Sequence, residues 1–288
     1  MKGSFILLNK ERGITSNKID NKVKKALYFS KVGHLGTLDP DASGLLILMT
    51  DRATKCAKYF EDLDKVYEMT IIFGQSSDTY DLEGNIIESI DVDLSNKEKE
   101  IDEVIASFKG ILTQTPPIYS AIKVEGMPLY RYAHKGLDVE IPKRTVEIYD
   151  IERISPITYI KPHSYMIIRA HVSKGFYMRS LAFDLGKKLG VPSMSKMIKR
   201  IKEGPFSLDD AFSLDDILNN HFKNLNPIAY LDFPRVDVDD LKYKDVLNGK
   251  RLAFEFDSKY VSIFHDGEFV AIYQYDEINK LYKMDFLA

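Results

Sequence analysis

The chain has 288 residues, of which 44% are hydrophobic and 11% aromatic. This length and composition exclude a disordered protein and predict a globular one, with one large domain and one small domain. No apolar run approaches the roughly 20 residues that a membrane helix needs, and the start of the chain does not resemble a signal sequence, so we expect a cytoplasmic protein. The single cysteine, Cys56, excludes an internal disulfide and a metal site built from several cysteines.

The formal net charge of −3 by itself argues against a nucleic-acid partner. The charges are unevenly distributed, however: residues 207–288 contain 9 Lys and Arg against 16 Asp and Glu, whereas residues 1–206 contain 31 against 27. Two basic clusters stand out, Lys18, Lys22, Lys24, Lys25 and Lys31, and then Lys187, Lys188, Lys196, Lys199, Arg200 and Lys202. Each cluster alone fits an ordinary solvated surface, but two of them in the same part of the chain indicate contacts with phosphate groups.

Apolar residues in the first part of the chain recur with the spacing of both strands and helices. Strands are predicted at 5–8, 45–49, 67–73, 118–124, 145–154 and 165–172. Helices are predicted at 16–27, 52–60, 101–108 and 177–189. Asp51 is the expected cap of the second helix, and Tyr67 is expected on the apolar side of the third strand. Residues 76–85 are expected to form a polar loop.

A boundary is predicted near residues 226–234, where two prolines interrupt an acidic stretch. It divides the chain into a domain of residues 1–228 and a small β domain of residues 229–288. Strands are predicted in the small domain at 252–256, 261–265, 268–275 and 281–286. The pair Asp266 and Gly267 between two of these strands is typical of a tight hairpin turn.

One carboxylate, Asp39, lies among glycines and directly before a proline in the segment 32–46. Pro40 disfavours a helical conformation at Asp39, and the glycines permit tight turns and the close approach of another molecule. Such a loop can present a carboxylate to a ligand. The alternative is a simple turn in which Asp39 binds its own backbone.

The segment from Gly33 to Leu46, together with the Ala-Thr-Lys element at 53–55, resembles the signature loop of the TruB family of tRNA pseudouridine synthases. Its pattern is approximately G-H-x-G-T-L-D-P-x-A-x-G-x-L, which is long and specific. Four further segments resemble elements of the same family in the same order, at 9–16, 64–67, 115–126 and 175–186. The chain is therefore identified as a member of this family.

The resemblance implies a mixed α/β fold with a largely antiparallel central sheet, followed by a PUA-like β domain. It also implies that uridine is isomerised to pseudouridine at T-loop position 55 of tRNA, without a cofactor or metal. The predicted catalytic residues are Asp39, Tyr67 and Arg179, with Arg179 pairing with Asp39. The predicted substrate-binding residues are His34, Tyr177, Ile198, Lys10, Lys196, Lys199 and Arg200, among which Lys10 supports the loop and His34 contacts the RNA.

This chemistry breaks the bond between uracil N1 and sugar C1′ and joins C5 to the same carbon. A carboxylate held ionised can act in it as nucleophile or base, and an adjacent arginine would offset the cost of shielding that charge from water. Attack at uracil C6, attack at C1′ and proton abstraction from the sugar all remain open. The target must leave the base stack, which costs least in an RNA loop, so the expected partner is the T-arm of tRNA, bound by a monomer.

Two other functions are compatible with parts of the sequence. One is a non-catalytic protein that binds or remodels RNA and retains the synthase fold. The other is a hydrolase of small glycosides, but such enzymes usually need two carboxylates, and Asp41 would point away from Asp39 in an extended chain.

Overall fold

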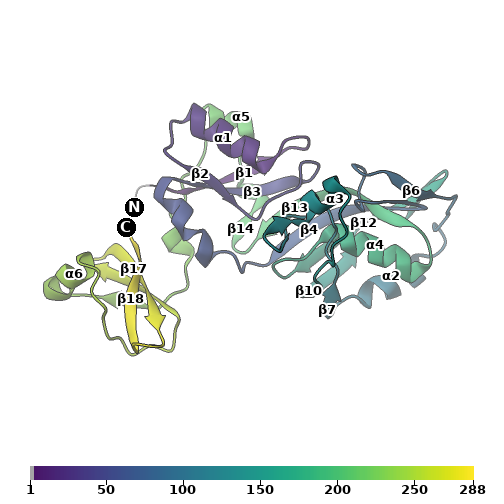
Figure 1. Cartoon of the computed structure of the whole chain (residues 1–288). Helices are drawn as coiled ribbons and strands as arrows, with labels where there is room; N and C mark the ends of the chain where they lie inside the picture. Colours follow the sequence, from purple (N-terminus) through teal and green to yellow (C-terminus); the bar gives the residue numbers. More distant parts are fainter. Residues whose placement is uncertain (1–2) are drawn as a thin grey trace.

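The computed structural model describes residues 3–288, and its main body is built on one large sheet (Figure 1). Within the described residues this sheet has ten strands, most of which form one continuous path. In order across the sheet, the path contains β1 (Phe5–Lys10), β3 (Ser43–Thr50), β13 (Ser193–Glu203), β4 (Lys65–Phe73), β12 (His163–Val172), β10 (Arg144–Arg153) and β7 (Gly110–Gln114). The remaining strands extend single neighbours: β2 (Val32–Leu35) pairs with β3, β11 (Thr158–Ile160) with β12, and β14 (Phe206–Ser207) with β13.

The paired strands of this sheet are antiparallel apart from β13 and β3. These two run parallel, with Lys199 opposite Ser43 and Arg200 opposite Gly44. The prediction of a mixed α/β fold with a largely antiparallel central sheet is therefore confirmed. The parallel junction places the beginning of β3, directly after the Asp39 loop, against β13.

Helices with one apolar face cover this sheet. They are α1 (Ser16–Ala26), α2 (Glu98–Ala106) and α4 (Met178–Leu189). Thr15 caps the first, because its hydroxyl accepts a hydrogen bond from the Lys18 N–H at 3.2 Å, and Gly190 ends the last in a left-handed conformation. Their buried side chains join those of the sheet in the largest apolar core, and the helices predicted at these three places are confirmed.

The segment after β3 is helical as predicted, but it forms a 3₁₀-helix, η1 (Asp51–Tyr59), and the predicted capping role is wrong. Asp51 is itself the first residue of this helix and has a φ of 48°. Its carboxylate accepts hydrogen bonds from the backbone N–H of Ser30 at 2.8 Å and from the Ser30 hydroxyl at 2.5 Å. The side chain therefore ties the turn to the residues before β2 and does not cap η1.

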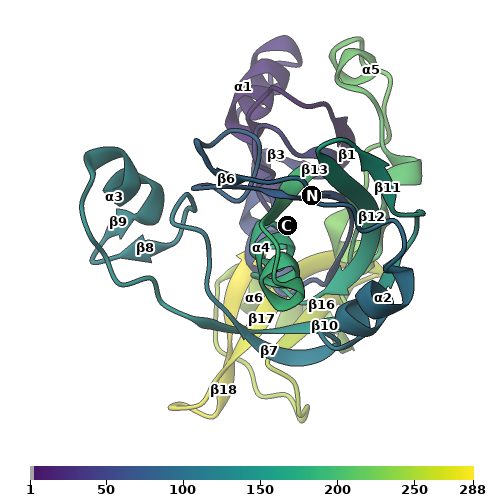
Figure 2. The same ribbon diagram turned by 90° about the vertical axis from the view of Figure 1, so that its right-hand side faces the viewer.

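The predicted strand at 118–124 is wrong, because only its last two residues form a strand. These are β8 (Lys123–Val124), which pairs with β9 (Met127–Pro128) ahead of the short helix α3 (Leu129–Lys135). Two prolines precede the segment and lack the N–H groups that a sheet requires. Figure 2 shows β8, β9 and α3 standing away from the main sheet.

The strand β13 is not among the predicted strands, although it lies between β3 and β4 in the sheet. Its lysines make the sequence resemble a basic surface segment. In the fold, Met194 is buried while Lys199 and Lys202 are exposed, so the strand presents both apolar and basic residues.

Shorter elements connect these parts. The predicted loop at 76–85 connects β5 (Gln75–Ser77) and β6 (Ile86–Ser89), which pair as a hairpin. The loop is attached to the main sheet, because the backbone N–H of Ser195 on β13 donates to the Tyr80 carbonyl at 3.0 Å. The segment after β14 contains η2 (Leu208–Asp210), α5 (Leu214–Leu218) and η3 (Pro227–Tyr230). The predicted boundary after residue 228 falls within η3. Within residues 3–288, no helix is long and apolar enough to span a membrane.

The C-terminal part forms a second sheet with its own apolar core. Its order is β15 (Arg235–Asp237), β16 (Tyr260–His265), β17 (Glu268–Asp276) and β18 (Leu281–Leu287), with α6 (Asp240–Leu247) alongside. The strands predicted at 261–265, 268–275 and 281–286 are confirmed, and so is the hairpin turn, where Asp266 and Gly267 have φ of 49° and 80°. The strand predicted at 252–256 is wrong, since Leu252 makes an isolated bridge to Tyr282.

This second sheet packs against η1 of the main body. The Tyr59 hydroxyl donates to the Asp285 carboxylate at 2.6 Å, and the Arg52 guanidinium donates to the Leu287 carbonyl at 2.7 Å. Phe286 belongs to an apolar cluster that also contains Phe60 of the main body. The C-terminal sheet is thus attached to the main body by polar contacts of Arg52 and Tyr59 and by an apolar cluster that it shares with Phe60.

Candidate active site

The Asp39 loop connects β2 to β3 in a tight turn, which the Ala42 N–H closes on the Asp39 carbonyl at 3.1 Å. The Asp39 carboxylate reaches outward and its Oδ2 lies 2.9 Å from Nη2 of Arg179. Nearly half of its side chain, 49%, is exposed. The loop therefore presents a carboxylate that is ion-paired on one side and open on the other.

Arg179 lies at the start of α4 with only 7% of its side chain exposed. It donates hydrogen bonds to the carbonyls of Thr79 at 3.3 Å and Tyr119 at 3.0 Å. Its Nη1 is also 3.2 Å from Oδ2 of Asp81. One guanidinium thus joins the Asp39 loop, the segment after β5 and the segment before β8, and it stabilises the charge on Asp39 electrostatically.

Asp81 is the charged partner of Arg179 that no sequence motif indicates. It lies in the polar segment between β5 and β6, where an aspartate is unremarkable. No local sequence pattern marks Asp81, and only the fold brings its carboxylate to Arg179. The Ser77 hydroxyl accepts a hydrogen bond from the Asp81 backbone N–H at 3.1 Å, and this bond holds the turn between β5 and β6 in place.

A cavity of about 100 Å³ opens beside Asp39. Its walls combine the loop, β4, the start of α4 and β13, and they are formed by Thr37, Leu38, Asp39, Ala42, Tyr67, Phe176, Tyr177, Met178, Arg179 and Ile198. The structure therefore brings together five of the predicted site residues from four separate parts of the chain. A narrower hollow on the other side of the ion pair is lined by Asp41, Asp81, Ser195, Lys196 and Met197.

Tyr67 and Tyr177 supply the aromatic walls of the cavity. Burial raises the pKa of the Tyr67 phenol, while the neighbouring Arg200 opposes that shift. Burial likewise raises the pKa of the Tyr177 phenol. Both rings therefore stay neutral at physiological pH. Gln114 fixes the backbone of Tyr177, because its side-chain amide donates to the Tyr177 carbonyl at 3.0 Å and accepts from its N–H at 2.8 Å.

Arg200 does not serve the predicted role of phosphate contact, because it is 1% exposed. Its guanidinium lies beneath the loop, where it donates to the carbonyls of Leu45 at 2.8 Å and Gly36 at 2.7 Å. The buried Glu203 carboxylate lies 3.3 Å from it. A Cβ at Gly36 would meet Arg200 Nη1 and Glu203 Oε1 at 2.7 Å, so this close packing requires glycine.

Lys10 holds the other end of the loop. Its ammonium donates to the carbonyls of Ala42 at 2.6 Å, Pro40 at 3.0 Å and Glu11 at 3.0 Å. An ammonium has three N–H donors, and these three bonds use all of them, so the amine supports the loop and has no donor left for RNA. Burial lowers the pKa of Lys10 to about 8.

The remaining predicted contacts lie at different places relative to the cavity. His34, on β2, is hydrogen-bonded to Asp20 and Thr37. Lys196 lines the narrower hollow and places its ammonium 4.6 Å from the centre of the Tyr165 ring. Lys196 is half-buried, and Lys199 is exposed on the same strand opposite Glu68, so both lysines are more accessible to a ligand than Arg200.

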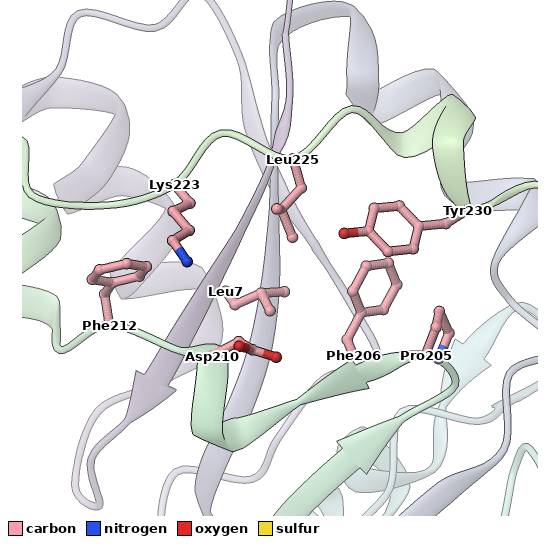
Figure 3. A pocket seen from close by; sticks show the side chains of 8 residues that line it. All are labelled: Leu7, Pro205, Phe206, Asp210, Phe212, Lys223, Leu225 and Tyr230. Carbon is pink, nitrogen blue, oxygen red and sulfur yellow. The ribbon is translucent and has the colours of Figure 1, made fainter.

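A larger cavity of about 220 Å³ lies elsewhere, between β1, β14 and the segment that leads to η3 (Figure 3). Its lining residues are Leu7, Pro205, Phe206, Asp210, Phe212, Lys223, Leu225 and Tyr230. None of these is a predicted site residue, and the chemistry-bearing groups gather around Asp39 instead. Among residues 3–288, no three His, Cys, Asp or Glu side chains are grouped as ligands for a metal ion.

Comparisons with known proteins agree with this arrangement. Residues 24–178 match the N-terminal domain of the TruB family pseudouridylate synthases. The chain is 39% identical to tRNA pseudouridine synthase B of Ligilactobacillus salivarius over 96% of both chains. It is 38% identical to the Streptococcus mutans protein of the same name, over 94% of this chain and 95% of the other.

Among solved structures, the fold resembles that in the crystal structure of a Cbf5-Nop10-Gar1 complex. The TM-score is 0.67 at 24% identity, with 94% of this chain and 78% of the other covered. The archaeal box H/ACA sRNP Nop10-Cbf5 complex gives the same TM-score at 22% identity, with 98% and 84% covered. At these identities the likeness establishes a shared fold.

Proposed function

The chain belongs to the TruB family of pseudouridylate synthases and is a tRNA pseudouridine synthase, and we propose that it isomerises the uridine at position 55 in the T-loop. The observation that carries this proposal is the Asp39 carboxylate, paired with the buried Arg179 at the mouth of a cavity with two tyrosine walls. Such a cavity suits a flat uracil ring whose sugar faces the carboxylate.

In the proposed reaction, the N1–C1′ bond breaks, the uracil turns and C5 bonds to C1′. The proton on C5 leaves, and N1 gains one, so the reaction is balanced without an external reagent. Asp39 acts as the nucleophile or base, and Arg179 stabilises its negative charge once RNA excludes water from the site. Tyr67 supports the uracil ring, and its neutral phenol is able to exchange the C5 proton.

RNA binding is proposed to use the half-buried Lys196, which lines the narrower hollow, and the exposed Lys199 on the same strand. Phosphate contacts of this kind supply affinity without reading sequence, whereas the extruded base is recognised in the cavity. His34 is proposed to contact the RNA near the position that the base leaves. Tyr177 and Ile198 complete the walls around the flipped uracil.

We further propose that the recognised element is the T-arm, that the enzyme acts as a monomer and that it works in the cytoplasm. Residues 229–288 are proposed to form a PUA-like domain. Its excess of acidic residues favours a minor contribution to phosphate binding.

Incubation of the protein with an unmodified tRNA transcript tests the proposal directly. We expect stoichiometric pseudouridine at position 55 and no modification of a matched transcript that carries cytidine there. Binding without any modified base would instead support a non-catalytic RNA-binding protein. Release of free uracil would support a glycoside hydrolase, although Asp41 is bound to Arg12 and does not supply a second free carboxylate beside Asp39.

A further inference from the structure

The imidazole of His34 is held from two sides by groups from different elements. Its Nδ1 lies 2.7 Å from Oδ2 of Asp20, which is on α1, and its Nε2 lies 3.1 Å from the hydroxyl of Thr37, which is in the Asp39 loop. Only 11% of the His34 side chain and 12% of the Asp20 side chain are exposed. The ring is thus fixed in both position and plane.

Asp20 is an unusual residue for its place in α1. It lies on the buried side of the helix beside Ile19 and Val23, where an apolar side chain would cost less free energy. Its second oxygen, Oδ1, is buried and has no hydrogen-bond partner within residues 3–288. The hydrogen bond to His34 is therefore the contact that compensates the burial of this carboxylate.

The contact with Asp20 determines how the ring is protonated. A carboxylate accepts hydrogen bonds and donates none, so Nδ1 of His34 carries a proton. In the neutral ring, Nε2 is then left as an acceptor, and the Thr37 hydroxyl donates to it. Thr37 in turn lines the cavity beside Asp39. A continuous chain of contacts therefore connects α1 with the wall of the candidate active site.

We propose that Asp20 is a positioning residue, which sets the tautomer and orientation of His34 and, through Thr37, the wall of the Asp39 cavity. The proposal rests on the proposed function, because His34 is the residue assigned to the RNA near the extruded base. Asp20 and His34 act after tRNA has bound through its phosphates, when the target base leaves the stack. Its loss is expected to slow base extrusion and leave most of the tRNA affinity intact.

The protonation of the ring can be measured without any activity assay. In full-length protein with ¹⁵N-labelled histidine, we expect His34 to show a protonated Nδ1 and an unprotonated Nε2 at a pH where the ring is neutral. Asp20→Ala removes the acceptor and should shift both nitrogen signals toward the averaged values of a free imidazole. An unchanged His34 spectrum in a folded Asp20→Ala protein would overturn the proposal.

A double-mutant cycle tests whether Asp20 acts through His34. We expect Asp20→Ala to lower the single-turnover rate at saturating tRNA by about tenfold, as for the loss of one hydrogen bond to a charged group, with the Kd for tRNA changed less than threefold. In a His34→Ala background the same change should have less than a twofold effect. An equal rate loss in both backgrounds would show a merely structural role and contradict the proposal.

Asp215→Ala is the matched control, because it makes the same change at an exposed carboxylate of α5, which packs near α1. It should leave the rate unchanged. Failure of the proposed function is distinguishable from failure of this inference: a wild-type protein that forms no pseudouridine refutes the former, while the nitrogen spectra decide the latter independently.

Discussion

Arg179 and Arg200 are both buried arginines that reach the Asp39 loop, but from opposite sides and with different partners. Arg179 meets two carboxylates, Asp39 and Asp81, at the edge of a cavity. Arg200 binds backbone carbonyls of the loop and the buried Glu203. The difference lies in how accessible the carboxylate partners are: of the two partners of Arg179, Asp39 is 49% and Asp81 18% exposed, whereas Glu203, the partner of Arg200, is 1% exposed. We therefore propose that the side with Arg179 is the reactive side of the loop and that the side with Arg200 supports it.

The strongest test of the reactive side is Asp39→Asn. We expect turnover to fall below detection while the Kd for tRNA changes only a few fold, because the amide keeps the shape and removes the charge. Single-turnover assays with purified protein and unmodified transcript provide the measurement. Measurable pseudouridine formation by the variant would contradict the catalytic role.

Arg179→Lys should lower kcat by about a hundredfold or more. An ammonium cannot contact both carboxylates and two carbonyls with the planar geometry of a guanidinium. The comparison with Arg200→Lys sharpens this prediction, since that variant should lose mainly stability. Near-normal kcat in folded Arg179→Lys protein would show that the ion pair with Asp39 is dispensable.

On the supporting side, Arg200→Met should destabilise the fold by about 3 to 5 kcal/mol, because Glu203 is left buried without its arginine. Urea unfolding measures this loss. The double variant Arg200→Met with Glu203→Leu should recover part of it, since the buried carboxylate is then removed, although Lys65, 3.2 Å from Glu203 and 12% exposed, also loses its partner. If Arg200→Met leaves the stability unchanged and weakens tRNA binding, Arg200 contacts phosphate and does not support the loop.

Lys10 offers a pH-dependent test of support for the loop. Its pKa in the folded protein is about 8, below the usual value of 10.5, so the unfolded chain binds more protons between these two values. The stability of the wild type relative to Lys10→Met should therefore rise by roughly 2 to 3 kcal/mol as the pH increases from 8 to 10.5. Urea unfolding at several pH values measures the difference. A constant difference across this range would show that Lys10 is not desolvated.

The smallest expected effect concerns three lysines of β13, of which Lys196 is half-buried and Lys199 and Lys202 are exposed. Replacing Lys196, Lys199 and Lys202 together by Ala should flatten the dependence of log Kd on log salt, by about 0.7 to 0.9 for each lost phosphate contact. A matched triple variant of the C-terminal part replaces Lys242, Lys244 and Lys283. If the matched variant flattens the slope more, the main RNA contact lies in the C-terminal sheet.

Much of the local structure follows from short patterns in the sequence. The strand carrying Tyr67, the helix that begins near Arg179 and the Asp266 hairpin each obey a local periodicity or turn preference, which the surrounding fold does not override. The strand β13 escapes prediction because its position between β3 and β4 gives it a mixture of buried and basic residues that has no simple period. The segment 118–124 is mispredicted because its apolar residues pack near α3 and not in the sheet.

The sequence by itself determined the family, the identity of Asp39 as the candidate reactive group and most element positions, because these depend on residues close together in the chain. Only the tertiary structure decided that Asp81 joins Arg179, that Asp20 holds His34 and that Arg200 is buried under the loop. These contacts join residues up to 164 positions apart. Whether a charged side chain faces a ligand or is enclosed depends on which strands meet around it, and no local pattern contains that information.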